Sequence, residues 1–201
     1  GHVLVVAGSR EMSGAGLLCS KAALRAGSGL VTWVMPDALL PALIGHVPEV
    51  MLAGLPGKWN LPEARAKLIA LVRSRCVTVI GPGLGRFPGD ADWLRMLWEE
   101  TNSPLVLDAD ALNILADADL SSWPKRETPT ILTPHPGEMA RLANVTTSEV
   151  QQNRIELARS YARRHRLTLV LKGAGTVVAA PDGSVYINPT GNPGMATGGA
   201  G

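Results

Sequence analysis

Short apolar runs rich in valine recur along the chain, and most of them end at glycine or a polar residue. Residues 3–7 run into Gly8 and Ser9, and residues 77–80 run into Gly81. Continuous apolar runs of this length are typical of strands that are buried on both faces of a parallel sheet. The same pattern predicts further strands at 30–35, 49–53, 105–107, 130–132 and 167–171.

Between these strands, apolar residues recur at helical spacing. Leu17 and Leu24 alternate with Lys21 and Arg25, which predicts a helix over 15–26. Helices are also expected at 37–44, 63–73, 93–98, 136–142 and 148–165. A Pro-Asp-Gly turn between apolar runs at 177–180 and 185–187 predicts a hairpin. This alternation predicts an α/β fold, a three-layer α/β/α sandwich around a mostly parallel sheet with the hairpin appended.

The unusual motifs of the chain each follow a predicted strand directly. They are Ser9 onward, 81–85, 108–113, 133–138 and 172–176. In an open α/β sheet, ligands bind beyond the carboxyl ends of the strands. We therefore expect these motifs to gather at one edge of the sheet and to form one site.

The composition suits one α/β domain, 1–201, because 201 residues with 46% hydrophobic content can bury a substantial core. The net charge is only +2. Arg159, Arg163, Arg164 and Arg166 fall on a predicted amphipathic helix, so we interpret them as a solvated face and expect no nucleic-acid partner. Prolines interrupt the apolar runs before they reach membrane-spanning length, so we expect no membrane association.

The two cysteines bear on the compartment. Cys19 and Cys76 lie far apart, each inside a predicted element, which indicates buried thiols in a reducing environment. Since no secretory signal is visible either, we expect a cytoplasmic protein. The chain begins inside a strand approach and stops at Gly201 within a glycine-rich motif, so we expect a piece of a longer chain, truncated at its C-terminal end.

Lys172 and His135 are candidates for contacts with a ligand. Lys172 stands at a strand end before Gly173, where an ammonium group can neutralise phosphate oxygens while the backbone approaches closely. The pattern is not a Walker A loop, and an exposed hairpin lysine is the alternative. His135 lies between Pro134 and Pro136 near a helix start, so it either orients a ligand or caps the helix.

The motif at 81–85 invites a dinucleotide-binding interpretation, but Arg86 stands where the third glycine should be, which argues against it. Asp108 and Asp110 are either catalytic or metal-associated, although an aspartate before a helix is more often a cap. The sequence shows no His, Cys and carboxylate cluster at metal-ligand spacing, so we expect no metal site built by protein side chains.

The last stretch, 188–201, is rich in glycine and carries no charge. Glycine at this density lets consecutive backbone N–H groups turn inward and hold an anion such as phosphate. The alternative is a flexible tail. The expected gathering of motifs at one sheet edge favours the anion site.

Taken together, these motifs resemble in order and spacing the ADP/ATP-dependent NAD(P)H-hydrate dehydratases. The motifs Thr-Pro-His-Pro-Gly-Glu at 133–138 and Lys-Gly-Ala-Gly-Thr at 172–176 carry most of the resemblance, which covers essentially the whole chain. It implies a ribokinase-like fold and a repair reaction in which ADP or ATP, with Mg²⁺, drives dehydration of the S-hydrate of NADH or NADPH. It also implies a homo-oligomer and an NAD(P)H-hydrate epimerase as a fused domain or separate partner.

The resemblance also assigns residues. The substrate would contact Ala15, Gly83, Gly85, His135 and Glu138. The nucleotide would contact Lys172, Gly173, Ala174, Gly175, Thr176, Asn192, Gly198, Gly199, Ala200 and Gly201. In the resembled family an aspartate that acts in the reaction directly follows the last glycine, so the catalytic base is expected outside this chain. On that basis the chain as given is expected to be inactive.

Two other functions remain open. A small-molecule kinase of the ribokinase type, such as a vitamin-precursor kinase, shares the implied fold, but the motifs around His135 and Lys172 speak against it. A nucleotide-binding protein without catalysis would also explain a missing aspartate.

Overall fold

A single mixed sheet organises the protein, whose computed structural model describes residues 1–198. Its nine strands have the order β3-β2-β1-β4-β5-β6-β7-β8-β9. The strands are β1 His2–Val6, β2 Leu30–Pro36, β3 Met51–Leu55, β4 Val77–Ile80, β5 Leu105–Leu107, β6 Thr130–Leu132, β7 Thr168–Leu171, β8 Thr176–Ala179 and β9 Val185–Asn188. Neighbours from β3 through β7 are parallel, and β8 and β9 are antiparallel additions, which confirms the predicted sheet and its hairpin.

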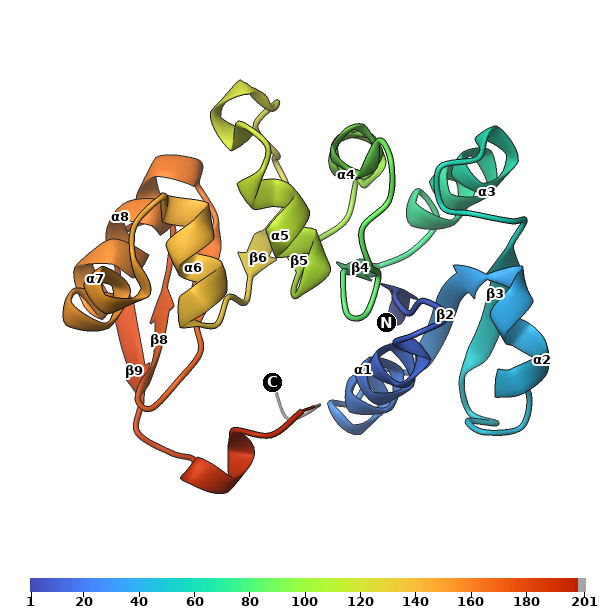
Figure 1. The fold of residues 1–201 in the computed structure, drawn as a ribbon, viewed down its shortest axis with the longest axis horizontal. Coiled ribbons are helices and arrows are strands. Elements are labelled where there is room, and N and C mark those ends of the chain that lie inside the picture. The colour runs from blue at the N-terminus through green and yellow to red at the C-terminus, as the bar shows by residue number, and fades with distance from the viewer. Residues whose placement is uncertain (199–201) are drawn as a thin grey trace.

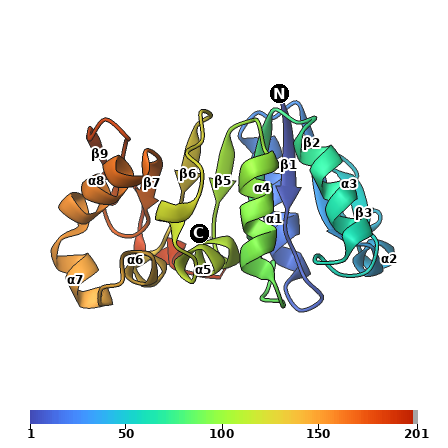
Figure 2. The ribbon, with the colours of Figure 1, turned by 90° about the horizontal axis from the view of Figure 1, so that it is seen from above.

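Helices cover the two faces of this sheet unequally. The α-helices are α1 Ser13–Arg25, α2 Leu40–Leu43, α3 Pro62–Val72, α4 Asp90–Glu100, α5 Asp110–Ala116, α6 Pro136–Ala143, α7 Thr147–Gln152 and α8 Arg154–His165, and the 3-10 turns are η1 Asp37–Leu39, η2 Leu120–Ser122 and η3 Pro193–Met195. Figure 1 shows α3, α4, α5, α6 and α8 on one side of the sheet and α1 and α2 on the other. Figure 2 shows the first group in front of the strands. None of the helices within residues 1–198 is long and apolar enough to cross a membrane.

Successive side chains of β1 point to opposite faces of the sheet and belong to two separate hydrophobic cores. Leu4 and Val6 belong to the core under α3 to α8, and Val5 belongs to the core under α1 and α2. In the second core, Trp33 of β2 is fully buried and its indole N–H donates to the Ala7 carbonyl at 2.8 Å. A Cβ on Gly16 would overlap the Trp33 ring, so this glycine lets α1 lie directly on the indole. That packing fixes the start of α1 beside the end of β1.

Across β5 to β9, the sheet face on the α1 side carries no α-helix of residues 1–198 (Figure 1). Val106, Ile131, Val170 and Val178 on these strands are half-buried, and Tyr186 is 63% exposed. In the described residues, the three-layer arrangement is therefore complete only over the β1 to β4 half.

Two expectations from the sequence are wrong in detail. The helix expected over 148–165 is two helices, because Asn153 (φ −128°, ψ 32°) leaves the helical conformation and α8 restarts at Arg154. Cys76 is exposed in a bend before β4 rather than buried in a strand. Cys19 in α1 is half-buried, and burial together with the charge of Asp108 raises the pKa of its thiol to about 11.

Candidate functional site

The loops after β1 and β4 meet at the point where the strand order reverses. β1 lies between β2 and β4: the next strands in sequence, β2 and β3, are added on one side of β1, and the strands from β4 onward are added on the other side. Open α/β sheets form a ligand crevice at such a reversal of strand order. The Gly8 N–H donates to the Pro82 carbonyl at 2.9 Å. Gly83 has φ +64°, and a Cβ there would lie 2.6 Å from the Met12 carbonyl oxygen and 2.8 Å from the Ala15 Cβ. The structure thus brings Ala15 and Gly83 together.

The loop after β4 also abuts the loop after β5. Gly81 has φ +127°, and a Cβ on it would overlap the Asp108 carbonyl oxygen. Gly85, with φ +76°, donates its N–H to the Asp110 carboxylate at 2.8 Å. Asp110 is therefore tied to the glycine motif, and its carboxylate is not a helix cap.

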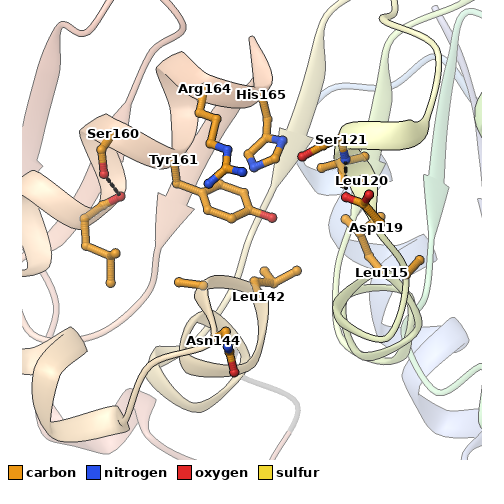
Figure 3. A pocket seen from close by; sticks show the side chains of 13 residues that line it. Leu115, Asp119, Leu120, Ser121, Leu142, Asn144, Ser160, Tyr161, Arg164 and His165 are labelled. Atoms are coloured by element: carbon orange, nitrogen blue, oxygen red, sulfur yellow. Dashed lines mark hydrogen bonds between the residues drawn. The ribbon is translucent and has the colours of Figure 1, made fainter.

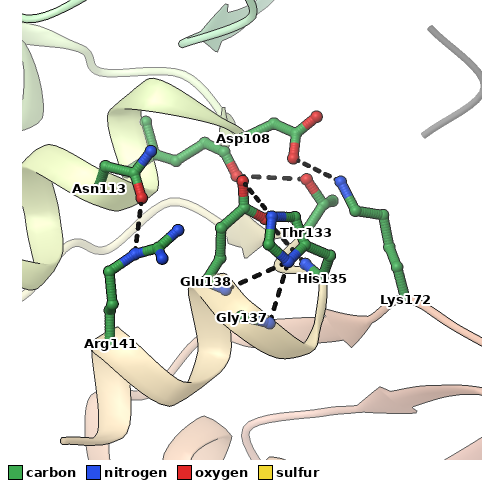
Figure 4. Close-up of polar contacts among 9 residues, drawn as sticks. Asp108, Asn113, Thr133, His135, Gly137, Glu138, Arg141 and Lys172 are labelled. Carbon is green, nitrogen blue, oxygen red and sulfur yellow. Dashed lines mark hydrogen bonds and ion pairs between the residues drawn. The ribbon is translucent and has the colours of Figure 1, made fainter. Parts of the chain in front are cut away.

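An ion pair spans the carboxyl ends of two strands that are not neighbours. Lys172, which follows β7, places its Nζ 2.8 Å from Oδ1 of Asp108, which follows β5 (Figure 4). Both side chains are about a quarter exposed or less, at 25% and 21%. Ala109, with φ 52°, is the N-cap of α5, and no side chain caps that helix, so the usual capping role of such an aspartate does not apply. Asp108 instead holds the Lys172 ammonium over β6.

His135 begins α6 as a capping residue and remains available to a ligand. Its Nδ1 accepts hydrogen bonds from the N–H groups of Gly137 (3.0 Å) and Glu138 (3.3 Å), and a Glu138 oxygen accepts from the His135 N–H at 2.8 Å. This reciprocal pattern is a capping box. Because Nδ1 accepts, the proton of the neutral ring lies on Nε2, which is 3.5 Å from Oε1 of Glu138, and the side chain is 52% exposed. Both sequence interpretations of His135, cap and contact, are therefore compatible.

Glu138 is the buried carboxyl of this cluster, with 5% of its surface exposed. Burial raises its pKa, and the charge of Asp108 raises it further. The hydrogen bond from the His135 backbone, the His135 ring and the Lys172 ammonium act in the opposite direction. Glu138 thus shares one electrostatic environment with Asp108 and Lys172 (Figure 4).

Arg154, at the start of α8, holds the loop 172–176 from behind. Its Nη2 donates to the carbonyl oxygens of Leu171 (3.1 Å) and Lys172 (3.3 Å) and lies 3.5 Å from that of Gly175. A Cβ on Gly173, whose φ is +135°, would lie 3.1 Å from the guanidinium, so this glycine leaves room for the arginine. Burial lowers the pKa of Arg154. Sequence reasoning missed this residue, because it lies on another element and in no motif.

A cavity of about 540 Å³ lies beside this loop. Its lining combines the apolar residues Ile155, Ala174, Val177 and Ile187 with the polar and charged residues Gln151, Gln152, Asn153, Arg154 and Glu156. Ala174 and Gly175 of the loop therefore line this cavity together with Arg154.

The expected C-terminal contacts are not joined to this cluster in the described residues. Asn192 caps η3, where its side-chain oxygen accepts from the Gly194 N–H at 2.9 Å, and both Asn192 and Gly198 are exposed. Gly199, Ala200 and Gly201 lie outside the described residues. Gly83, His135 and Lys172 thus share the carboxyl edge of the sheet, whereas the Asn192 side chain bonds locally.

The family model described as NAD(P)H-hydrate dehydratase matches residues 3–201. The chain belongs to the NAD(P)H-hydrate dehydratase family.

The chain spans only part of the length of the relatives that it matches. It is 46% identical over 204 residues to a bifunctional NAD(P)H-hydrate repair enzyme of Moorella thermoacetica and spans 38% of that protein's length. The crystal structure of the ADP/ATP-dependent NAD(P)H-hydrate dehydratase of Bacillus subtilis, co-crystallised with ATP/Mg²⁺ and soaked with CoA, aligns with a TM-score of 0.80 at 33% identity, over 99% of this chain and 69% of that one. A ribokinase-like superfamily protein of Enterococcus faecalis aligns with a TM-score of 0.81 at 27% identity, over 99% and 66%. The predicted family and ribokinase-like fold are confirmed.

Proposed function

We propose that this protein uses ADP or ATP to dehydrate the S-hydrate of NADH or NADPH back to the reduced dinucleotide. The observation that carries the proposal is the Lys172–Asp108 ion pair, in which Nζ lies 2.8 Å from Oδ1. This pair holds the Lys172 ammonium at the same edge of the sheet as His135, the N-cap of α6. The small-molecule kinase and the non-catalytic nucleotide binder are outcomes of the test below.

The nucleotide is proposed to lie along the loop 172–176. Gly173 and Gly175, both with positive φ, let the backbone approach phosphate oxygens, and the Lys172 ammonium adds charge. Ala174, Val177 and Ile187 give the cavity beside this loop an apolar surface that suits the planar base. Asn192 and 198–201 are proposed to complete the phosphate contacts.

The hydrated dinucleotide is proposed to occupy the crevice at the β1 and β4 ends. We propose that the dinucleotide contacts the backbone of Ala15, Gly83 and Gly85, and that His135 donates a hydrogen bond to it from Nε2–H. Glu138 is proposed to act through His135, since its carboxylate fixes the His135 backbone at 2.8 Å. A substrate between the crevice and the loop 172–176 would have its reactive ring near the nucleotide phosphates.

The chemistry requires that a poor leaving group becomes a good one. The ring hydroxyl attacks the terminal phosphorus, and the bond between that phosphorus and the rest of the nucleotide breaks. The carbon–oxygen bond then breaks to release phosphate, and a proton leaves the neighbouring carbon, so the ring double bond is restored. The Lys172 ammonium and backbone N–H groups of the glycine-rich loop stabilise the negative charge of the moving phosphoryl group.

A base must accept the proton of the hydroxyl. In residues 1–198, the carboxylates of Asp108, Asp110 and Glu138 already accept from Lys172, the Gly85 N–H and the His135 N–H. By resemblance to the family, we propose that the aspartate expected directly after Gly201 is the base. The described residues include no group of three or more His, Cys, Asp or Glu that could hold a metal ion, so Mg²⁺ is proposed to arrive on the nucleotide phosphates.

The wider setting is proposed by family resemblance. We place the protein in the cytoplasm, as a homo-oligomer, together with an NAD(P)H-hydrate epimerase domain or protein that interconverts the substrate epimers.

The test is an assay of the protein with its complete natural chain. Hydrated NADH is incubated with Mg²⁺ and ADP or ATP, and the absorbance of the reduced nicotinamide is followed. Recovery that requires the nucleotide, and that falls when Lys172 is replaced by Ala, supports the proposal. Phosphorylation of a thiazole or pyrimidine alcohol with the hydrate left unchanged would establish the kinase instead, and nucleotide binding without either reaction would establish the binder.

A further inference from the structure

A second cavity lies in the helical layer, away from the Asp108–Lys172 pair. It has a volume of about 380 Å³ and opens between η2 and the C-terminal ends of α5, α6 and α8. Helices α5 and α6 begin at the carboxyl edge of the sheet, beside the ion pair, and end at this cavity. We call it the α5–α6–α8 pocket. Its volume falls within the range of sites for small organic ligands.

The pocket has an apolar floor and a charged rim. The apolar lining includes Leu115, Leu120, Leu142 and Leu157, and we call this part of the pocket the floor. Figure 3 shows Tyr161, Arg164 and His165 reaching from α8 toward Asp119 and Ser121 on the opposite wall. An apolar floor below a few convergent polar groups is the usual construction of a small-molecule site.

The rim carries opposite charges on its two walls. Among the described residues, Arg164 and Asp119 form no ion pair, and an Asp119 oxygen accepts from the Ser121 N–H at 3.0 Å. Both charges act on the ring between them: burial and Arg164 lower the pKa of His165, and Asp119 raises it. The two walls thus present the Arg164 cation and the Asp119 anion, which both act on the His165 imidazole and do not pair with each other.

The remaining rim groups are hydrogen-bond donors and backbone carbonyls. The Tyr161 ring lies 4.4 Å from that of His165, and burial raises the pKa of its hydroxyl to about 12, so it stays a donor at neutral pH. Helices α5 and α6 direct their C-terminal carbonyls and negative dipole ends to this region. These ends favour a positive group near Asp119, on the wall opposite Arg164.

We propose that the α5–α6–α8 pocket binds a small zwitterion with an apolar side chain, which is the chemistry of an aliphatic or aromatic amino acid. The ligand carboxylate pairs with Arg164 and the Tyr161 hydroxyl, and its ammonium pairs with Asp119. The apolar side chain lies on the leucine floor. A simple anion would leave the charge of Asp119 without a counter-charge and a simple cation would do the same to Arg164, so a ligand with both charges uses the whole rim.

The experiment uses three probes of matched shape and the full chain. L-leucine carries both charges, 4-methylpentanoate lacks the ammonium, and 3-methylbutylamine lacks the carboxylate. Binding is measured by calorimetry and by saturation-transfer NMR. We expect leucine to bind at least about tenfold more tightly than either analogue, since each analogue loses one charge-assisted contact.

Three variants localise the binding. Arg164→Gln is expected to remove the preference for leucine over the amine, because the charge that pairs with the ligand carboxylate is lost. Asp119→Asn is expected to remove the preference for leucine over the acid, because the charge that pairs with the ligand ammonium is lost. The asparagine oxygen can still accept from the Ser121 N–H, so the local fold is kept. Leu142→Trp fills the floor and should abolish binding of leucine, with circular dichroism confirming the fold. Absence of leucine binding up to about 10 mM, equal binding in all variants, or tighter binding of the acid alone would overturn the proposal.

Discussion

The β1–β4 crevice and the Asp108–Lys172 cluster lie at the same edge of the sheet but are constructed in opposite ways. In the crevice, glycines bring backbone against backbone, as where a Cβ on Gly83 would lie 2.6 Å from the Met12 carbonyl oxygen. In the cluster, long side chains bridge strands and loops: Lys172 reaches Asp108, and Arg154 holds the loop 172–176. Backbone contacts cannot be adjusted by rotating a side chain, so the crevice should tolerate substitution poorly, and the cluster should respond gradually to changes of charge.

The sharpest test of this difference is Gly81→Ala. The new Cβ would overlap the Asp108 carbonyl oxygen in a backbone with φ +127°, and neither neighbour can rotate away. We expect the free energy of unfolding to fall by about 3–5 kcal/mol, in the range of severe core defects. Chemical denaturation measures it.

Gly89→Ala is the matched control, because Gly89 also has a positive φ, +77°, but meets nothing within 4 Å. Its cost should be only the backbone strain, about 1–2 kcal/mol. Equal losses for Gly81→Ala and Gly89→Ala would show that the crevice backbone yields and that the comparison is wrong.

In the cluster, Lys172→Ala should mainly weaken nucleotide binding. Losing the ammonium removes a charge-assisted contact worth about 1–3 kcal/mol, or roughly fivefold to 150-fold in the nucleotide KM. Lys172→Arg keeps the charge and should retain most of the affinity. A change confined to the KM of the hydrated dinucleotide would contradict the assignment of Lys172 to the nucleotide.

Arg154 offers a smaller and more specific test of the loop. Arg154→Ala removes the donor to the Leu171 and Lys172 carbonyls, and we expect a loss of stability of about 1–2 kcal/mol together with a higher nucleotide KM. The side chain also explains Gly173, whose Cβ would lie 3.1 Å from the guanidinium. Gly173→Ala should therefore cost less in the Arg154→Ala background than in the wild type. Strictly additive losses in this double-mutant cycle would show that the two residues do not interact.

Much of this arrangement could be predicted from the sequence because strand ends carry local signals. The parallel strands, the hairpin, the helix start at His135 and the shared edge for Gly83, His135 and Lys172 follow from apolar runs, prolines and glycines. Pairwise geometry between elements has no such signal. Asp108 has the appearance of a helix cap in the sequence, and only the fold brings it across β6 to Lys172.

The same reason explains the missed role of Arg154 and the undivided helix expected over 148–165. An arginine at a helix start normally has an exposed side chain. Here the break at Asn153 turns α8 so that the Arg154 guanidinium reaches the β7 loop. Sequence periodicity does not record such a break, because Asn153 is followed by a new helix with a similar pattern.

The smallest expected effect concerns two capping boxes that differ in burial. Glu138 caps α6 from a buried position, and burial followed by the charge of Asp108 raises its pKa. Glu149 caps α7 on the surface, and hydrogen bonds from Thr146 lower its pKa. A carboxyl whose pKa is raised on folding holds its proton more tightly in the folded state, so its contribution to stability falls as the pH rises above the ordinary value of 4.5. A carboxyl with a lowered pKa contributes stability above 4.5 and loses it as the pH falls.

The paired variants Glu138→Gln and Glu149→Gln separate these signs, since glutamine keeps an oxygen that accepts the capping hydrogen bond. Unfolding free energies are measured by urea denaturation between about pH 4 and pH 8, and the wild-type value is subtracted at each pH. For Glu138→Gln the difference should move in favour of the variant as the pH rises, because the wild type must then bury a charge. For Glu149→Gln it should move in favour of the wild type over the same range. If both differences moved in the same direction, the carboxyl of Glu138 would be as well solvated as that of Glu149. The conclusion that Glu138 shares one electrostatic environment with Asp108 and Lys172 would then be wrong.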